Sequence, residues 1–241
     1  MSDVGSQCAD DDRVGSSCVE DMHAKGPCTD DPRADTVING GKTPINAQVD
    51  EEDALRYLGH RGQPLGEDLA VVFQNVAAKV NALQATGVAK QFPVARVAPE
   101  GVRLAGTSLV LPGSHIARHV GTAQAVLLLA VTLGFECERL LRQTACVHAV
   151  QGLMADACAS SMVENAAEVF SNTLAYEVAS QGFTCGKRFS PGYGDFPLSV
   201  QPAFLETLGA TKTLGIQVTP GDLMVPTKSI TAVIPLFEHG A

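Results

Sequence analysis

The first 47 residues of this 241-residue chain contain no Phe, Tyr or Trp, and this property separates a tail from a body. Residues 1–35 carry nine acidic and three basic residues, whereas the formal net charge of the whole chain is -9. A segment with such a charge excess and no aromatic side chain cannot bury enough apolar surface to offset its conformational entropy. We therefore predict a disordered acidic tail over residues 1–47 and one folded domain over residues 48–241.

The composition of the whole chain narrows the class of protein. Hydrophobic residues make up 45% and charged residues 18%, which is the balance of a globular domain. The negative net charge argues against nucleic acid and against an anionic membrane surface as partners. The longest nearly apolar run, 125–135, is too short to span a bilayer, and no secretory signal opens the chain. We expect a cytoplasmic protein.

Three cysteines recur every ten residues in the tail, at Cys8, Cys18 and Cys28, and each is followed by one residue and then two acids. Thiolates beside carboxylates could bind a metal ion. Structural zinc sites usually bring ligands within about two to four residues of each other, and wider spacing in a flexible chain has a large closure cost. A solvated extension without metal is the default interpretation. The odd total of seven cysteines favours free thiols.

The body combines helical and extended segments. Hydrophobic periodicity, caps and turn residues predict helices over 50–58, 67–86, 114–120, 137–180 and 198–208. Asp50 and Ser114 can cap the helices that begin there, and Gly182 can stop the one over 137–180. That helix has one apolar stripe from Val163 to Val178, and its small residues at 155–161 permit close approach of another backbone. Extended segments are predicted over 92–97, 107–111, 215–218 and 229–234. Residues 125–132 fit either a buried strand or the start of a helix, since the run is uniformly apolar. Helices and strands do not alternate regularly, so we predict an α+β fold rather than a doubly wound sheet.

Common catalytic signatures are absent from the sequence, which has no phosphate-binding loop, dinucleotide fingerprint or nucleophile elbow. His115 and His119 are four residues apart, so a helix would place both on one face, as in some metal sites. No acidic residue or third ligand lies near them in sequence, and surface or capping roles are commoner. Cys185 precedes Gly-Lys-Arg and could have a lowered thiol pKa, although a lone cysteine before a loop is more often a bystander.

The loop Arg188-Phe-Ser-Pro-Gly-Tyr-Gly-Asp195 carries the most chemical information. Pro191 stiffens the backbone, and the two glycines let it turn and approach a ligand closely. Arg188 offers a planar fork suited to a carboxylate or phosphate, and Tyr193 adds an aromatic face and a hydroxyl. On composition alone, this segment fits a ligand-binding loop and a structural turn equally well.

The sequence of this loop resembles the S-adenosylmethionine-binding motif, Arg-x-[Ala/Ser]-Pro-Gly-Tyr, of the activation domain of cobalamin (vitamin B12)-dependent methionine synthase. A second block, Leu-Met-Val-Pro-Thr-Lys-Ser at 223–229, looks like the Met-x-Pro-x-x-Ser segment that follows in that domain. Upstream, 54–62 and 156–160 are similar to the stand-alone branch of the family. The resemblance covers roughly residues 48–235 and implies mixed helices with a twisted, mainly antiparallel sheet.

The resemblance also assigns ligand-binding roles. Arg188 would pair with the carboxylate of S-adenosylmethionine, and Ser190, Pro191 and Gly192 would meet the ligand largely through the backbone. Tyr193 would sit where the ligand faces the corrin ring. Glu164 would correspond to an acidic residue near the sulfonium, and the competing interpretation is a solvated charge on a helix. The resemblance implies no metal site in this chain.

The chain lacks the family's Asp-x-His-x-x-Gly cobalamin box and has no cysteine cluster like the zinc site that activates homocysteine. The resemblance therefore implies a separate reactivation module, one that binds S-adenosylmethionine and supports reductive methylation of cob(II)alamin held by a methionine synthase core. Flavodoxin or ferredoxin would supply the electron. The alternatives are an autonomous S-adenosylmethionine-using methyltransferase and an accessory subunit of another corrinoid methyltransferase.

Overall fold

The structure is a computed structural model that describes residues 38–63 and 65–238. The predictions for the tail cysteines, and for disorder before residue 38, lie outside the described residues. The helices of the described chain are α1 (Glu51–Tyr57), α2 (Glu67–Asn81), α3 (Ser114–Val120), α4 (Gly134–Val147), α5 (Ala149–Ser180), α6 (Gln201–Leu208) and α7 (Ala210–Leu214), with a 3-10 turn at Leu198–Val200.

The strands form one main antiparallel sheet and a small hairpin. Their bounds are β1 (Thr43–Ile45), β2 (Ala85–Ala98), β3 (Gly101–Leu104), β4 (Val110–Pro112), β5 (Ala125–Thr132), β6 (Phe183–Cys185), β7 (Gln217–Val218), β8 (Met224–Val225) and β9 (Ser229–Glu238). The main sheet has the order β4-β3-β2-β5-β9-β6, with β1 paired to β2, and β7 pairs with β8. All these pairings are antiparallel, which confirms the predicted α+β class.

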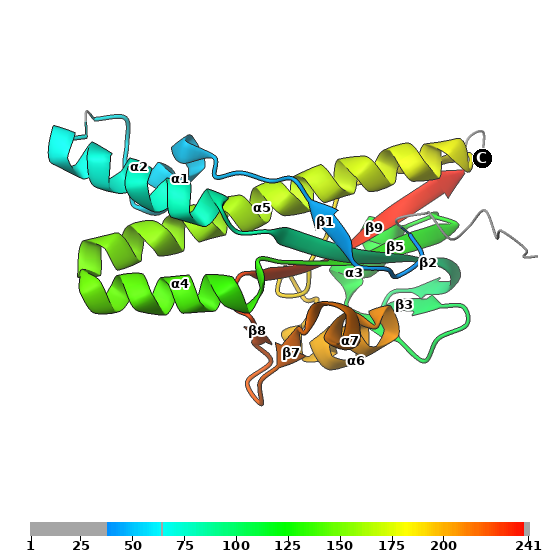
Figure 1. The fold of residues 1–241 in the computed structure, drawn as a ribbon. Coiled ribbons are helices and arrows are strands. Elements are labelled where there is room, and N and C mark those ends of the chain that lie inside the picture. The colour runs from blue at the N-terminus through cyan, green and yellow to red at the C-terminus, as the bar shows by residue number, and fades with distance from the viewer. Residues whose placement is uncertain (1–37, 64, 239–241) are drawn as a thin grey trace, which may run out of the picture. The chain divides into compact units, whose positions relative to one another are not determined.

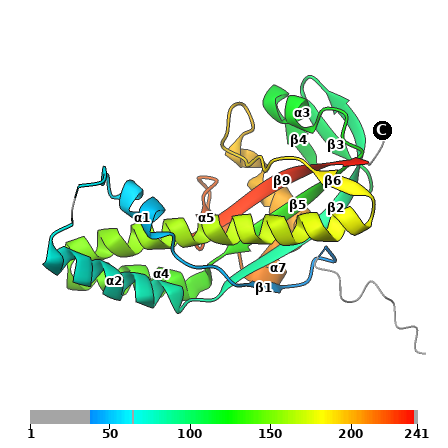
Figure 2. The same cartoon turned by 90° about the horizontal axis from the view of Figure 1, so that it is seen from above.

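Helices cover both faces of the main sheet (Figures 1 and 2). One buried cluster joins α5, α2 and α1 to alternate residues of β5, including Leu127 and Leu129. The other joins α3, α6 and α7 to the intervening residues, including Val126 and Leu128. Because side chains of a strand alternate between faces, a strand that is buried on both sides reads as a continuous apolar run. This explains why periodicity could not separate strand from helix over 125–132.

The long helix α5 runs along one face of the sheet and carries the predicted apolar stripe. The residues of that stripe are all buried: Val163, Ala167, Phe170, Leu174 and Val178. The stretch predicted as helical from 137 to 180 is two helices, separated at His148, whose backbone is extended. The predicted close approach at the small residues of α5 is also present, since Asp50 N–H donates to Ser161 Oγ and that hydroxyl donates to the Asp50 carbonyl.

The predicted tail boundary at residue 47 lies too late in the chain. Strand β1 pairs with β2 from Thr43 to Ile45, and the side chains of Ile45 and Ala47 are buried. Helix α2 ends at Asn81 instead of Thr86, and a turn over residues 82–84 leads into β2. Strand β3 was not predicted. No helix of the described residues is long and apolar enough to cross a membrane.

Candidate functional site

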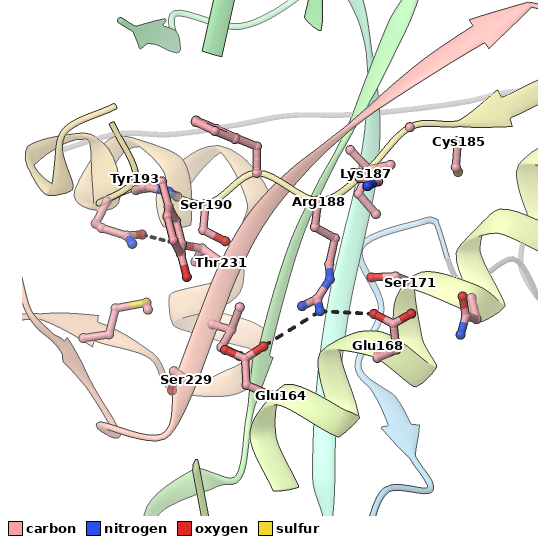
Figure 3. Close-up of a pocket in the computed structure, with 18 of the residues that line it drawn as sticks. Glu164, Glu168, Ser171, Cys185, Lys187, Arg188, Ser190, Tyr193, Ser229 and Thr231 are labelled. Carbon is pink, nitrogen blue, oxygen red and sulfur yellow. Dashed lines mark hydrogen bonds and ion pairs between the residues drawn. The ribbon is translucent and has the colours of Figure 1, made fainter. Parts of the chain in front are cut away.

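A cavity of about 810 Å³ opens between α5, β9 and the loop that follows β6 (Figure 3). Helix α5 supplies one wall and the loop from Gly186 to Tyr193 supplies much of another. Strand β9 contributes Ser229 and Thr231 at its N-terminal end, and Met224 of β8 lies nearby on the lining. The volume falls within the range of small-molecule sites, which is roughly 300–1,000 Å³.

The wall from α5 is polar, although the opposite side of that helix is core. Its lining residues follow the three- and four-residue spacing of one helical face: Glu164, Glu168, Ser171, Asn172 and Ala175. The buried stripe from Val163 to Val178 belongs to the hydrophobic cluster between α5 and the sheet. A single helix therefore buries its apolar side and presents two carboxylates to the cavity.

Strand pairing sets the position of Arg188. Gly186 N–H donates to the Pro235 carbonyl at 2.8 Å, and Phe189 and Val233 exchange two backbone hydrogen bonds at 2.9 Å. The segment after β6 thus continues along β9. Arg188 Nη2 lies 3.2 Å from Glu168 Oε2 and 3.8 Å from Glu164 Oε2, as the dashed lines of Figure 3 show.

The loop then folds back on itself through a tight turn. Gly192 N–H donates to the Phe196 carbonyl at 2.7 Å, and Phe196 N–H donates to the Tyr193 carbonyl at 3.1 Å. Gly192 has φ +97°, a value that side-chain-bearing residues rarely adopt. Pro191 is buried, whereas Tyr193 is 66% exposed while still lining the cavity. The turn therefore places an aromatic side chain at the open part of the site.

Asp195 fixes the far end of this loop to α3. Its carboxylate accepts hydrogen bonds from Ser114 N–H and Ser114 Oγ, both at 2.7 Å, and from His115 N–H at 2.9 Å. These donors stabilise the charged form, and they hold the pKa of Asp195 well below its usual range. Ser114 was predicted to cap this helix with its own side chain, and Asp195 caps it instead.

The two histidines of α3 make further contacts with this loop. His115 Nδ1 accepts from Asp195 N–H at 3.1 Å, and His119 Nε2 lies 2.7 Å from the Lys187 carbonyl. The His119 ring also stacks on Phe189, with 4.9 Å between the ring centroids. Each histidine thus contacts the loop through a ring nitrogen. Within residues 38–63 and 65–238, no group of three His, Cys, Asp or Glu side chains could hold a metal ion.

The second sequence block reaches the cavity through β8 and the start of β9. Ser229 lies on the cavity lining, and its hydroxyl donates to Thr132 Oγ1 at 2.8 Å. Next to it, Lys228 Nζ lies 2.8 Å from both Asp156 Oδ1 and Ser160 Oγ of α5. This lysine joins two of the blocks on which the family resemblance was based, and it ties the start of β9 to α5.

Cys185 lines the cavity but has no activated thiol. Burial raises the pKa of this thiol above its ordinary value, so the lowered pKa considered from the neighbouring Lys187 and Arg188 is wrong. Burial likewise raises the pKa of Cys137 and Cys158, each to about 11. These cysteines are free and favour the neutral thiol.

The structure brings most of the predicted site residues together. Glu164, Arg188, Ser190, Pro191 and Tyr193 all line the same cavity. Gly192 is not among the lining residues, and its N–H is engaged within the turn.

Two lining features were not predicted. One is Glu168, which lies four residues after Glu164, so helical spacing alone could have identified it. The other is the buried hydrogen bond from Thr231 Oγ1 to Gln201 Oε1 at 2.9 Å. It joins positions 30 residues apart, and no local sequence signal marks it.

Comparison with known proteins supports the fold. No protein-family model matches the chain, and no curated protein matches it in sequence. Among solved structures, the crystal structure of the MetH reactivation domain bound to AdoHcy is similar, with a TM-score of 0.62 and 18% identity. The match covers 83% of this chain and 78% of that chain. At this identity the similarity establishes a shared α+β fold.

Proposed function

We propose that this chain binds S-adenosylmethionine in the cavity and supports reductive methylation of cob(II)alamin carried by a separate cobalamin-dependent methionine synthase. The observation that carries the proposal is the joint placement of Arg188, Tyr193 and Glu164 around one cavity of about 810 Å³. The shared fold with the MetH reactivation domain, which was solved with AdoHcy, supports the same class of ligand.

The charged groups of the cavity suit the amino-acid end of this ligand. The Arg188 side chain is 23% exposed and lines the cavity, so it is partly accessible to a ligand there. A guanidinium fork pairs with a carboxylate through charge-assisted hydrogen bonds. Glu164 is the natural neighbour for the sulfonium, since an opposite charge nearby stabilises a cation that has left water.

The loop residues supply the rest of the proposed binding surface. Ser190 and Pro191 line the cavity and would contact the ligand largely through their backbone. A contact from Gly192 would have to come from its Cα or carbonyl, since its N–H donates to Phe196. Tyr193 is exposed at the opening, where it would lie between the bound ligand and the partner's corrin ring.

The contribution of this chain to the reaction is positioning. The partner's cobalamin would supply the methyl-accepting cobalt, and flavodoxin or ferredoxin would supply the one electron that its reduction requires. Arg188 and Glu164 would hold the ligand so that its sulfonium methyl points out of the cavity past Tyr193. Transfer of the methyl group to that cobalt would break the methyl–sulfur bond with its electron pair left on sulfur, so that S-adenosylhomocysteine would remain in the cavity.

The test is the visible spectrum of a methionine synthase core that lacks an activation domain, supplied with reductant, S-adenosylmethionine and this protein. We expect faster formation of methylcobalamin than in a control without the protein. Replacing Tyr193 by Ala should slow that formation while most of the ligand affinity remains, because Arg188 and the loop backbone are unchanged. No acceleration by the parent protein with a cognate core would contradict the proposal. Methyl transfer to a small molecule without any corrinoid protein would favour the autonomous methyltransferase.

A further inference from the structure

One guanidinium faces two carboxylates in this cavity. Glu164 and Glu168 project from successive turns of α5, and both form ion pairs with Arg188. The shorter of the two, at 3.2 Å, is a hydrogen bond to Glu168, and the 3.8 Å separation from Glu164 is too long for one. The dashed lines of Figure 3 join Arg188, and not the neighbouring Lys187, to these carboxylates.

The charges of this trio restrict which ligand can use Arg188. Glu168 occupies Nη2 of Arg188, so a ligand carboxylate that takes the Nη2 side of the guanidinium replaces Glu168 as its hydrogen-bonded partner. If the ligand brings only a carboxylate, Glu168 loses its cation and faces a third negative group, which is unfavourable. If the ligand also carries an ammonium beside its carboxylate, Glu168 gains a new cationic partner in place of the one it lost.

We propose that Glu168 makes the cavity selective for ligands that end in an α-amino acid. It exchanges Arg188 for the ligand's α-ammonium when the ligand's carboxylate takes its place on the guanidinium. This inference rests on the proposed function, because it concerns the same ligand in the same cavity.

The spacing of the two carboxylates fits this division of roles. Residues four apart on a helix are separated by about 6 Å along its axis. The sulfonium and the α-ammonium of S-adenosylmethionine are joined by a short alkyl chain, so the two positive charges can face successive helical turns. Glu164 would then face the sulfonium and Glu168 the ammonium.

The exchange predicts a change in selectivity. The probes are S-adenosylmethionine and its analogue in which a hydroxyl replaces the α-amino group, with dissociation constants measured by isothermal titration calorimetry. The parent protein should prefer the amino ligand. In Glu168→Gln, the hydroxy analogue no longer breaks an ion pair, and the amino ligand no longer gains one. The preference should fall by about tenfold, which is the size of one charge-assisted hydrogen bond.

Two further variants make the test specific. Glu206→Gln makes the same substitution at an exposed helix position outside the cavity lining, and it should leave the preference unchanged. Glu164→Gln should instead reduce the preference for S-adenosylmethionine over S-adenosylhomocysteine, which lacks the sulfonium charge. Glu168 is 62% exposed, so its substitution should not affect folding, and circular dichroism melting verifies this.

The outcomes separate the inference from the function on which it rests. If the parent protein binds none of these ligands, the proposed function fails, and the role of Glu168 fails with it. If the parent binds S-adenosylmethionine but Glu168→Gln keeps the parental preference for the amino ligand, only the role of Glu168 is overturned. A reduced preference in Glu168→Gln, with Glu206→Gln unchanged, supports the exchange.

Discussion

Gly194 is the position where the backbone of the loop from Arg188 to Asp195 tolerates a side chain least. Its φ is +59°, and a Cβ added there would lie 2.1 Å from His115 Nδ1. That separation is far below any real carbon–nitrogen contact, so the His115 ring would have to move. The same ring nitrogen accepts the hydrogen bond from Asp195 N–H, which fixes the end of the loop to α3. Gly194→Ala should therefore loosen the loop as well as destabilise the fold.

The expected destabilisation has two parts. Holding an alanine in the left-handed region costs about 1–2 kcal/mol. Displacing the His115 ring removes a hydrogen bond worth about 1 kcal/mol, so the free energy of unfolding should fall by about 2–3 kcal/mol in all. Gly106 provides the control, because it also has positive φ, +72°, but has no atom within 4 Å of an added Cβ. Gly106→Ala should show the first part alone.

Urea unfolding of both variants, followed by circular dichroism, measures these changes. The double variant Gly194→Ala/His115→Ala completes a double-mutant cycle. It should be about 1 kcal/mol more stable than the sum of the two single effects predicts, because the alanine at 194 no longer meets the His115 ring. The affinity of Gly194→Ala for S-adenosylmethionine should also be lower than that of Gly106→Ala. If the two alanine variants are equally stable, or if the coupling is zero, the His115 ring does not brace Gly194 as the structure has it.

Two other perturbations test the site and the domain boundary. Arg188→Ala should weaken S-adenosylmethionine binding by roughly ten- to a hundredfold, because a charge-assisted pair is lost. The control is Arg103→Ala, which removes an exposed arginine on β3, and equal affinities of Arg188→Ala and the parent protein would contradict the role of Arg188. A chain that begins at Gln48 loses β1 and the buried Ile45, so it should melt several degrees below a chain that begins at Ile38. The melting temperature should fall by about 2–4 °C for each kcal/mol of unfolding free energy that is lost. Equal melting temperatures would mean that β1 contributes nothing to stability.

Local signals in the sequence predicted those elements whose cause is itself local. Asp50 was expected to cap the first helix, and its carboxylate does accept from Asp53 N–H at 3.1 Å. The stop near Gly182 is also present, with the helix capped at Gln181 and Gly182 at φ +85°. Caps and helix stops depend on residues within one turn of each other, so the sequence contains everything needed to place them.

Elements that depend on distant partners were predicted less well. Residues 82–86 are mostly apolar, and they continue the helical pattern of α2 into what is the start of β2. Residues 82–84 instead form a turn, and β2 begins at Ala85. The extended conformation from there on is set by pairing with β1 on one edge and, from Thr86, with β5 on the other. Strand β3 spans only Gly101–Leu104, and three of its four residues pair with partners on both β2 and β4, which the sequence does not identify.

The same distinction applies within the candidate site. Arg188 and Tyr193 could be selected from the loop itself, and Glu168 follows from Glu164 by helical spacing. The role of His115 and His119 could not be found in this way, because their contacts in the loop lie 80 and 68 residues further along the chain. Their four-residue spacing suggested a metal motif, whereas in the structure both rings contact the loop beside α3.

Three of the contacts that hold the loop restrict different parts of it. Pairing of Phe189 with Val233 fixes the segment that carries Arg188, and the hydrogen bond from Gly192 to Phe196 closes the turn. Asp195 then anchors the end on α3. The side chain of Arg188 is therefore presented to α5 by backbone contacts that do not involve the ligand. Such preorganisation lowers the entropic cost of binding, so the affinity for the proposed ligand should depend on the exchange of partners at Arg188 more than on ordering of the loop.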